Sequence, residues 1–167
     1  MMKTLLFFRH GKSDWDADYG PDHDRPLARR GRKAAKKMGR YLKSIDEVPE
    51  VVITSTAVRA RTTAQLANKA GKWSVQVVET RDLYDASPST VLDLVHGLDD
   101  DVASAMLVGH EPTWSASIRI LSAGGGVQFP TAAMASIQFD VDKWSDVQPA
   151  GGRLKWLVIP RSLPDDL

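Results

Sequence analysis

The chain has 167 residues, of which 43% are hydrophobic and 26% are charged, and its formal net charge at pH 7 is +1. These values are those of an ordinary globular protein, and we expect residues 1–167 to form a single domain. The near-zero net charge gives no field that would recruit nucleic acid or a membrane surface. The absence of cysteine excludes disulfides, thiolate nucleophiles and cysteine-ligated metal sites.

The N-terminal run MMKTLLFF resembles a signal peptide only superficially. Its apolar part has about five residues, and no small-residue cleavage site follows it. No other segment approaches the ~20 apolar residues that a membrane-spanning helix needs. We therefore expect a cytoplasmic protein.

The first strand is predicted over Lys3–Phe8 and runs directly into Arg9, His10 and Gly11. Open α/β sheets bind ligands at the carboxyl ends of their strands. Arginine offers a planar positive charge that suits phosphate, and histidine is easily kept neutral and nucleophilic near pH 7. This strand end therefore predicts phosphate chemistry.

A loop rich in Gly, Pro and Asp follows, over residues 16–25, and should lie on the rim of that pocket. Its Asp22, His23 and Asp24 have metal-ligand chemistry, but three adjacent residues seldom converge on one ion. A solvated polar loop is the preferred interpretation.

The clearest helix is predicted between Leu27 and Ile45, where apolar residues recur at three- and four-residue spacing. Its other face is basic, and the net charge near zero favours a solvated face over a docking surface for nucleic acid or an acidic protein. The basic residues are Arg29, Arg30, Arg32, Lys33, Lys36, Lys37, Arg40 and Lys43.

A second strand, Val51–Thr54, ends in Ser55 and Thr56, either of which suits the N-cap of a following helix. Arg59 lies in the first turn of that helix, and Arg61 follows two residues later. Because residues two apart on a helix point to different sides, we expect one of these arginines to face the pocket. A cation beside a helix N-terminus predicts an anion site.

A further strand, Ala103–Val108, also ends in chemistry-bearing residues, Gly109, His110 and Glu111. Pro112 suits the first position of the next helix. Three strand ends thus deliver Arg-His, Arg and His, a coincidence that predicts one shared site.

The rest of the chain completes an α/β pattern. Short strands are predicted over residues 75–78, 135–141 and 154–159, and a helix begins at Ser87-Pro88. The last two strands should be neighbours at one end of the sheet and at least partly antiparallel. The alternation of strands and helices predicts a three-layer α/β domain.

Five segments resemble the histidine phosphatase superfamily, which is phosphoglycerate mutase-like, and within it the small SixA-like phosphohistidine phosphatases. They are FFRHGKSDW, DRPLARRGRKAA, ITSTAVRARTTA, LVGHEP and LKWLVIP, in the family's order. The resemblance implies a doubly wound, mostly parallel sheet with an antiparallel edge. It also implies that His10 is the nucleophile and that Arg9, Arg59 and His110 hold the phosphoryl oxygens.

The chemistry of these groups agrees with the resemblance. Charge on three equatorial phosphoryl oxygens can be met by two guanidiniums and a second imidazole. Nearby cations should lower the pKa of His10, and a hydrogen bond from its other ring N–H to a backbone carbonyl should fix its tautomer. Because the arginines supply the charge, we expect no metal and no cofactor.

The proton donor is less clearly marked. Glu111, next to His110, is the favoured candidate, and Glu79 and Asp82 are rivals. Chains similar to SixA often carry Asn after the second histidine, so Glu111 departs from the nearest pattern. The alternative is that Glu111 merely caps the helix at Pro112.

The predicted function is that of a metal-independent phosphatase that acts on phosphohistidine in a protein. The short chain leaves little sequence for insertions that would enclose a small substrate, which favours an open pocket and argues against a mutase. The alternatives are a small-molecule phosphomonoesterase and a non-catalytic phosphate-binding adaptor. We expect a phosphorylated protein or small phosphorylated substrate as partner, no nucleic acid or membrane, and a monomeric state.

Overall fold

The computed structural model describes residues 2–167 and has one six-stranded sheet in that range. The strands are β1 (Lys3–Arg9), β2 (Val51–Ser55), β3 (Gln76–Thr80), β4 (Ser104–Gly109), β5 (Met134–Phe139) and β6 (Gly152–Val158). The helices are α1 (Arg29–Ser44), α2 (Val58–Ala70), α3 (Pro88–His96) and α4 (Thr113–Ser122). Three single 3₁₀ turns lie in the connections between them, η1 (Asp22–Asp24), η2 (Arg81–Leu83) and η3 (Trp144–Asp146), and a fourth, η4 (Pro160–Ser162), follows β6.

The strand order is β3-β2-β4-β1-β5-β6. The first four strands of the chain are parallel to one another, β5 is antiparallel to β1, and β6 is antiparallel to β5. This arrangement confirms the mostly parallel α/β sheet with an antiparallel edge.

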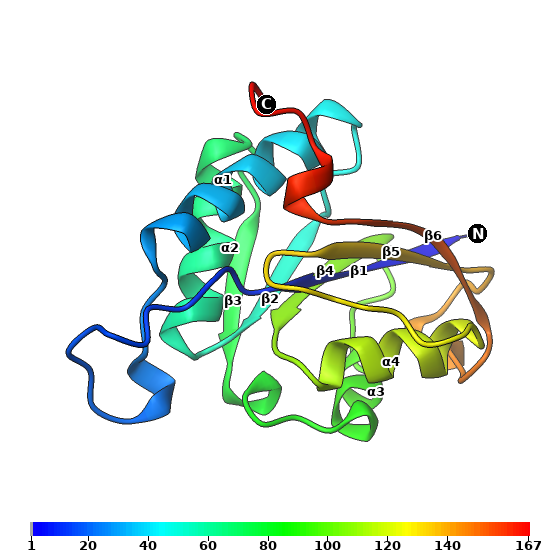
Figure 1. Ribbon diagram of the computed structural model, residues 1–167. Helices are drawn as coiled ribbons and strands as arrows, with labels where there is room; N and C mark the ends of the chain where they lie inside the picture. Colours follow the sequence, from blue (N-terminus) through cyan, green and yellow to red (C-terminus); the bar gives the residue numbers. More distant parts are fainter. Residues whose placement is uncertain (1) are drawn as a thin grey trace.

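The helices cover both faces of the sheet, α1 and α2 on one side and α3 and α4 on the other (Figure 1). Alternate side chains of β1 supply the two cores. Leu5 and Phe7 pack on the side of α3 and α4, whereas Leu6 and Phe8 pack on the side of α1 and α2. All four are essentially inaccessible, so β1 is a central strand that anchors the segment following it.

Two glycines allow close contacts near the ends of β1 and β4, one with the backbone of Lys12 and one with the ring of Trp114. A Cβ atom at Gly31, in the first turn of α1, would lie 2.2 Å from the Lys12 carbonyl oxygen. A Cβ atom at Gly109 would lie 2.6 Å from the indole ring of Trp114, whose N–H donates to the Phe8 carbonyl oxygen (3.0 Å). Glycine at these positions lets α1 and α4 sit directly against the strand ends.

Three helix starts differ from the predictions. Helix α4 begins at Thr113, so Pro112 is its N-cap and not its first helical residue. Helix α1 begins at Arg29, because Leu27 forms a bridge with Ser13 instead of joining the helix. The N-cap of α2 is Ala57 and makes no side-chain cap hydrogen bond, so neither Ser55 nor Thr56 is the cap. Both hydroxyls are engaged by histidines from elsewhere in the fold.

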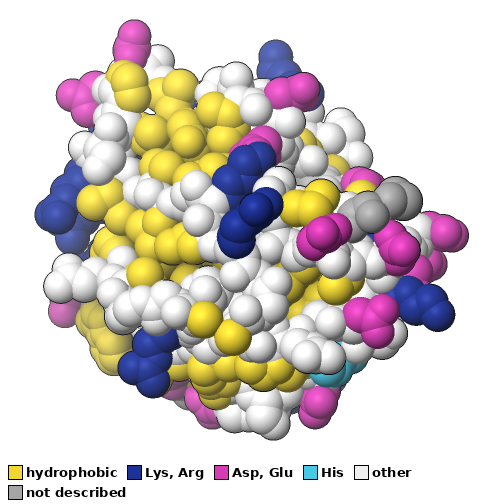
Figure 2. Space-filling view, turned by 90° about the vertical axis from the view of Figure 1, so that its right-hand side faces the viewer, with side chains coloured by type: hydrophobic (Ala, Val, Ile, Leu, Met, Phe, Trp, Pro, Cys, Tyr) yellow, Lys and Arg dark blue, Asp and Glu magenta, His cyan; other side chains and the backbone are white. Residues whose placement is uncertain are grey.

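Strand β6 forms one edge of the sheet and carries Arg153, Leu154 and Lys155 as exposed residues. On this side of the molecule, which Figure 2 shows, basic side chains lie in small, separate groups among hydrophobic and acidic ones. Charges on an edge strand oppose pairing with another sheet. Within residues 2–167, no helix has the length and apolar character needed to cross a membrane.

Candidate active site

Three neighbouring strands deliver polar residues to one edge of the sheet. Arg9 ends β1, Gly109 ends β4 and Ser55 ends β2, and these strands are adjacent and parallel. The His10 N–H donates to the Gly109 carbonyl oxygen (3.0 Å), and the His10 carbonyl accepts from the Ala132 N–H (3.0 Å). His10 is therefore held by backbone hydrogen bonds on both sides.

The two histidines meet, as the sequence predicts. The ring centroids of His10 and His110 lie 5.3 Å apart with an interplanar angle of 56°. They come from strand ends 100 residues apart in the chain. The two imidazoles therefore belong to one site.

The imidazole of His10 is held as a neutral ring with a free nitrogen. Its Nδ1 lies 2.7 Å from the Gly11 carbonyl oxygen, which can only accept, so Nδ1 carries the proton and Nε2 keeps its lone pair. Burial lowers the pKa of His10 to about 4, against the effect of the Gly11 hydrogen bond, and the charges of Arg59 and Arg9 lower it further. The predicted backbone hydrogen bond is confirmed.

His110 faces His10 and is held by a hydroxyl. Its Nε2 lies 2.8 Å from Ser55 Oγ, and its ring meets Tyr84 edge-on at 5.8 Å. Burial is the largest cause that lowers the pKa of His110 to about 3, and the charges of His10 and Arg59 lower it further. Among residues 2–167, the buried Nδ1 of His110 has no hydrogen-bond partner.

Arg59 and Arg61 divide as expected. Arg59 is 6% exposed and reaches the site, whereas Arg61 lies near the surface, with Nη1 3.5 Å from the Glu79 carboxylate. The guanidinium of Arg59 donates to both the carbonyl oxygen (2.9 Å) and the carboxylate (3.0 Å) of Asp22. Only the first arginine thus stands beside the histidines.

Asp22 is the main feature that sequence reasoning missed. Its carboxylate accepts from Tyr84 Oη at 2.8 Å and contacts the guanidiniums of Arg59 and Arg25. Burial alone would raise the pKa of Asp22, but the Tyr84 hydrogen bond and the Arg59 charge outweigh it and lower the pKa to about 2. Asp22 is exposed, as expected for a polar loop, but its contacts with Arg59 and Tyr84 across the site were not predicted.

The other residues of the same turn point elsewhere. His23 Nε2 lies 2.7 Å from Thr56 Oγ1, and the Asp24 carboxylate is 3.6 Å from His23 Nδ1. Arg25 is buried beneath the ring of Trp15, 3.6 Å from its centroid. Asp22, His23 and Asp24 thus do not converge on a common point.

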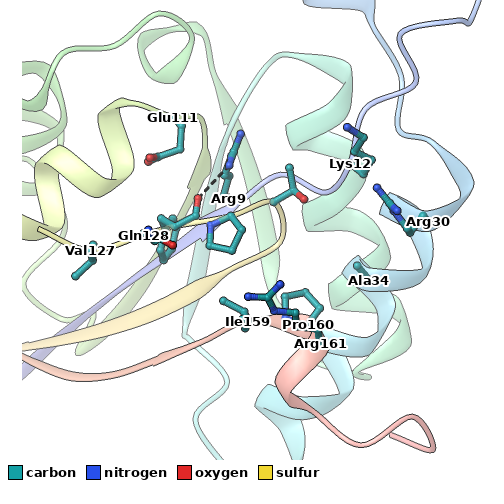
Figure 3. Close-up of a pocket in the computed structure, with 13 residues that line it drawn as sticks. Arg9, Lys12, Arg30, Ala34, Glu111, Val127, Gln128, Ile159, Pro160 and Arg161 are labelled. Carbon is teal, nitrogen blue, oxygen red and sulfur yellow. Dashed lines mark hydrogen bonds between the residues drawn. The ribbon is translucent and has the colours of Figure 1, made fainter.

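Arg9, the residue before His10, lines a groove of about 860 Å³ (Figure 3). Its Nη1 donates to the Phe129 carbonyl oxygen (3.0 Å), so the guanidinium is oriented by the segment that leads into β5. Burial lowers the pKa of Arg9, and the nearby charge of Glu111 opposes the shift. Arg9 is thus shared by the site and the groove.

The three acids considered as proton donors lie in different settings. Glu111 lines the groove, and its two carboxylate oxygens accept from the N–H (2.6 Å) and the hydroxyl (2.7 Å) of Ser115. It therefore caps the first turn of α4. Glu79 pairs with Arg61, and Asp82 is exposed on η2.

The arrangement suits an oxyanion. Within residues 2–167, buried nitrogens without a hydrogen-bond partner include Nε of Arg9, Nε of Arg59, Nε of Arg25 and Nδ1 of His110. Those of Arg9, Arg59 and His110 belong to the site of the two histidines. Buried donors normally have partners, so their concentration at this site calls for an explanation. In the same range, no group of three His, Asp or Glu side chains is placed to hold a metal ion.

Two further contacts were beyond sequence reasoning. The local sequence predicts only that Ser55 or Thr56 caps the next helix, and it gives no signal for Tyr84. Their partners, His110 and Asp22, lie 55 and 62 residues away in the chain. A hydroxyl residue directly at a strand end was the available hint for Ser55, because the other strand ends carry site residues.

Comparisons with known proteins agree with this geometry. Residues 5–90 match the model of the histidine phosphatase superfamily (branch 1). An uncharacterized protein of Mycobacterium tuberculosis (strain ATCC 25618 / H37Rv) is 35% identical over 163 residues, which cover 92% of this chain and 99% of that protein.

Solved structures give the same result. SixA of Nakamurella multipartitia, proposed to be a phosphohistidine phosphatase, is 27% identical, with a TM-score of 0.83 over 96% of this chain and 97% of that one. SixA of Agrobacterium tumefaciens, of the same proposed activity, is 26% identical, with a TM-score of 0.78 over 95% and 98% of the two chains. From the family match and these relatives, the chain belongs to the histidine phosphatase superfamily.

Proposed function

We propose that the chain is a phosphatase that moves the phosphoryl group of a phosphohistidine-bearing protein first to His10 and then to water. One observation carries the proposal. His10 has a free Nε2, and buried nitrogens of Arg9, Arg59 and His110 at the same site have no hydrogen-bond partner. A nucleophile and three oxyanion-binding side chains at one site are the parts that phosphoryl transfer requires.

In the first step, the lone pair on Nε2 of His10 attacks phosphorus. An N–P bond forms as the bond from phosphorus to the leaving nitrogen of the substrate breaks, and that nitrogen takes up a proton. The hydrogen bond from Nδ1 to the Gly11 carbonyl stabilises the positive charge that develops on the ring. Arg9, Arg59 and His110 stabilise the charge on the equatorial oxygens.

In the second step, a water molecule attacks the phosphorus of phospho-His10. A P–O bond forms, the P–N bond breaks, and its electron pair returns to Nε2 of His10. The proton lost by the water leaves with phosphate or solvent. His10 then leaves as a neutral imidazole, the form that its burial favours in the free chain.

Glu111 is proposed as the proton donor to the leaving group. It lines the groove beside Arg9, whereas Glu79 is paired on the outside of β3. An imidazole leaving group needs less assistance from an acid than an alkoxide does. A donor occupied by helix capping therefore fits a phosphohistidine substrate better than an alkyl phosphate ester.

The substrate class rests on two supports. The two SixA structures, both proposed to be phosphohistidine phosphatases, match almost the whole chain. The groove beside Arg9 is bounded by exposed side chains of several elements, which suits a protein surface. A small-molecule phosphomonoesterase, with the same covalent intermediate, is the second candidate.

The test compares three substrates side by side with a chelator present: a phosphohistidine protein, an aryl phosphate and a sugar phosphate. We expect the highest kcat/KM on the phosphohistidine protein. Rapid acid-free quenching should trap a base-stable, acid-labile phosphoryl group on the wild type, and His10→Ala should abolish it. His23→Ala, which removes a histidine outside the pair, is the matched control.

Three results would count against the proposal. Undiminished labelling of His10→Ala would remove the nucleophile. A clear preference for sugar phosphates would favour the phosphomonoesterase. Phosphate binding without turnover of any substrate would indicate an adaptor.

A further inference from the structure

We propose that the groove beside Arg9 binds an acidic segment of the substrate protein that flanks its phosphohistidine. This inference rests on the proposed function and adds to it a determinant of substrate choice. It would place the specificity of the enzyme in a surface that adjoins the phosphoryl site and shares Arg9 with it.

The groove begins at the site itself. Its volume is about 860 Å³, and its lining includes Arg9 and Glu111 but neither histidine. In Figure 3, Arg9 projects into its centre, with Glu111 on one side and Lys12 on the other. A chain that enters the site with its phosphoryl group on Arg9 would therefore continue along the groove.

Basic side chains from three elements surround the groove. Lys12 follows β1, Arg30 lies in the first turn of α1 and Arg161 lies on η4, and all three are exposed. Among residues 2–167, none of these three makes an ion pair. Glu111, the one acid of the lining, is occupied by Ser115. The groove therefore has a surplus of unpaired positive charge.

Other cations of α1 are used differently. Lys37 donates to the Leu163 carbonyl oxygen (3.1 Å) and lies 3.8 Å from the Asp165 carboxylate, and Arg40 donates to the Leu167 carbonyl oxygen (3.0 Å). The basic face of α1 is thus divided. One part contacts the end of this chain, and Arg30 faces the groove.

The distribution of these charges favours a polypeptide over a small anion. In Figure 3, Lys12 and Arg30 lie on one side of the groove, and Arg161 lies below with Ile159 and Pro160. The lining of the groove also includes apolar residues: Val127, Phe129, Pro130, Ile159 and Pro160. A compact dianion requires cations that converge on a point, whereas an extended segment with alternating acidic and apolar side chains matches spaced cations and an apolar floor.

The experiment uses two synthetic peptides of equal length with a central phosphohistidine, one flanked by Asp and Glu and the other by Asn and Gln. The readout is the ratio of their kcat/KM values. Because an exposed ion pair contributes ~0.2–1 kcal/mol, two pairs predict a preference of about fivefold for the acidic peptide at low salt. The preference should vanish at about 1 M salt, where the Debye length is ~3 Å.

The decisive variants remove the same number of charges from two places. Arg30→Ala with Arg161→Ala should abolish the preference. Lys33→Ala with Lys36→Ala, two exposed residues of α1 outside the groove lining, should retain it. Equal ratios for the two peptides, or equal losses in the two double variants, would overturn the proposal. A stronger, arginine-dependent preference for a small bisphosphorylated compound would overturn it as well.

The failure of this inference can be told from that of the proposed function. If both peptides are hydrolysed equally, the phosphatase stands and the groove proposal falls. If neither is hydrolysed, anisotropy of a fluorescent, unphosphorylated acidic peptide still decides the matter. The groove proposal is supported if the wild type and the lysine double variant bind this peptide and the arginine double variant does not. The proposal is rejected if the wild type does not bind it.

Discussion

Asp22 binds Arg59 through two of its oxygens, its carboxylate at 3.0 Å and its carbonyl at 2.9 Å. A carboxylate of the chain itself thus binds one of the cations that we propose to receive a phosphoryl group. Tyr84 donates to the same carboxylate at 2.8 Å, so the η1 turn is tied to both sides of the site. An incoming phosphoryl group and Asp22 then compete for the guanidinium of Arg59.

Asp22→Asn should strengthen inhibition by inorganic phosphate. The asparagine keeps the shape but removes the charge that competes on Arg59. Because the Asp22 side chain is 51% exposed, its charge is partly screened, and we expect the inhibition constant to fall by up to about fivefold. Competitive inhibition of aryl phosphate hydrolysis measures it.

Asp24→Asn is the matched control for Asp22→Asn, since Asp24 lies in the same turn with its carboxylate near His23. It should leave phosphate inhibition as in the wild type. A weaker inhibition in Asp22→Asn, together with a lower kcat, would instead show that Asp22 positions Arg59 for catalysis.

Glu111→Gln should separate substrates by their leaving groups. If Glu111 donates the proton, its loss slows an alkyl phosphate by about 10²-fold or more relative to an aryl phosphate, whose leaving group needs little assistance. Steady-state rates on the two esters measure this ratio. Ser115→Ala, which removes one of the two donors to Glu111, is the control for the capping role. Equal losses on both esters would leave Glu111 as a helix cap alone.

The depressed histidine pKa values predict a loss of stability in mild acid. The pKa of His10 is about 4 and that of His110 about 3, against about 6.5 in an unfolded chain. As the pH falls below 6.5, the unfolded chain takes up protons that the folded site refuses, so the free energy of unfolding decreases until the folded pKa is reached. The decrease between pH 7 and pH 5 is about 2 kcal/mol per histidine.

Urea unfolding of the wild type and His10→Asn at these two pH values tests the point. The variant should lose about 2 kcal/mol less than the wild type over the same interval, because one of the two titrating rings is gone. Identical pH dependence in both proteins would mean that His10 is not held neutral by the fold.

Gly31→Ala should destabilise the protein, although alanine is normally the better helix residue by about 1 kcal/mol. The added Cβ would lie 2.2 Å from the Lys12 carbonyl oxygen, so α1 must move away from the segment that follows His10. We expect a loss of about 2 kcal/mol in the free energy of unfolding, measured by urea denaturation, with a lower kcat. Gly125→Ala, where no atom lies within 4 Å of the added Cβ, should change neither quantity.

The strands and the residues at their ends could be predicted because the signal is local. Arg9 and His10 follow one apolar strand directly and His110 follows another, so parallel pairing of β1 with β4 brings them to one edge. Arg59 was likewise predicted from its place in the first turn of a helix after β2. These positions depend on the order of strands and little else.

The contacts that tune the site depend on distant partners. The local sequence predicts Ser55 or Thr56 as the cap of α2, but the hydroxyl of Ser55 lies beside His110, at the end of the neighbouring strand β4. Asp22 was expected in solvent because its loop is polar, yet Arg59, Arg25 and Tyr84 together hold it. In both cases a charge or ring from another element outweighs the local preference. For Glu111, the structure shows the capping contacts with Ser115, whereas the role of proton donor stays a prediction.

The tight fit of Trp114 against Gly109 has a consequence for how the second imidazole is kept in register. The residue before His110 is a glycine, and the indole of Trp114 occupies the space that a side chain would need. The position of the His110 imidazole therefore depends on how Trp114 packs in the hydrophobic layer under α4. Any loosening of that layer, by heat or by a smaller residue at 114, would displace the ring before the chain unfolds. The rate of catalysis should therefore fall as soon as the packing on the α4 side of the core is disturbed.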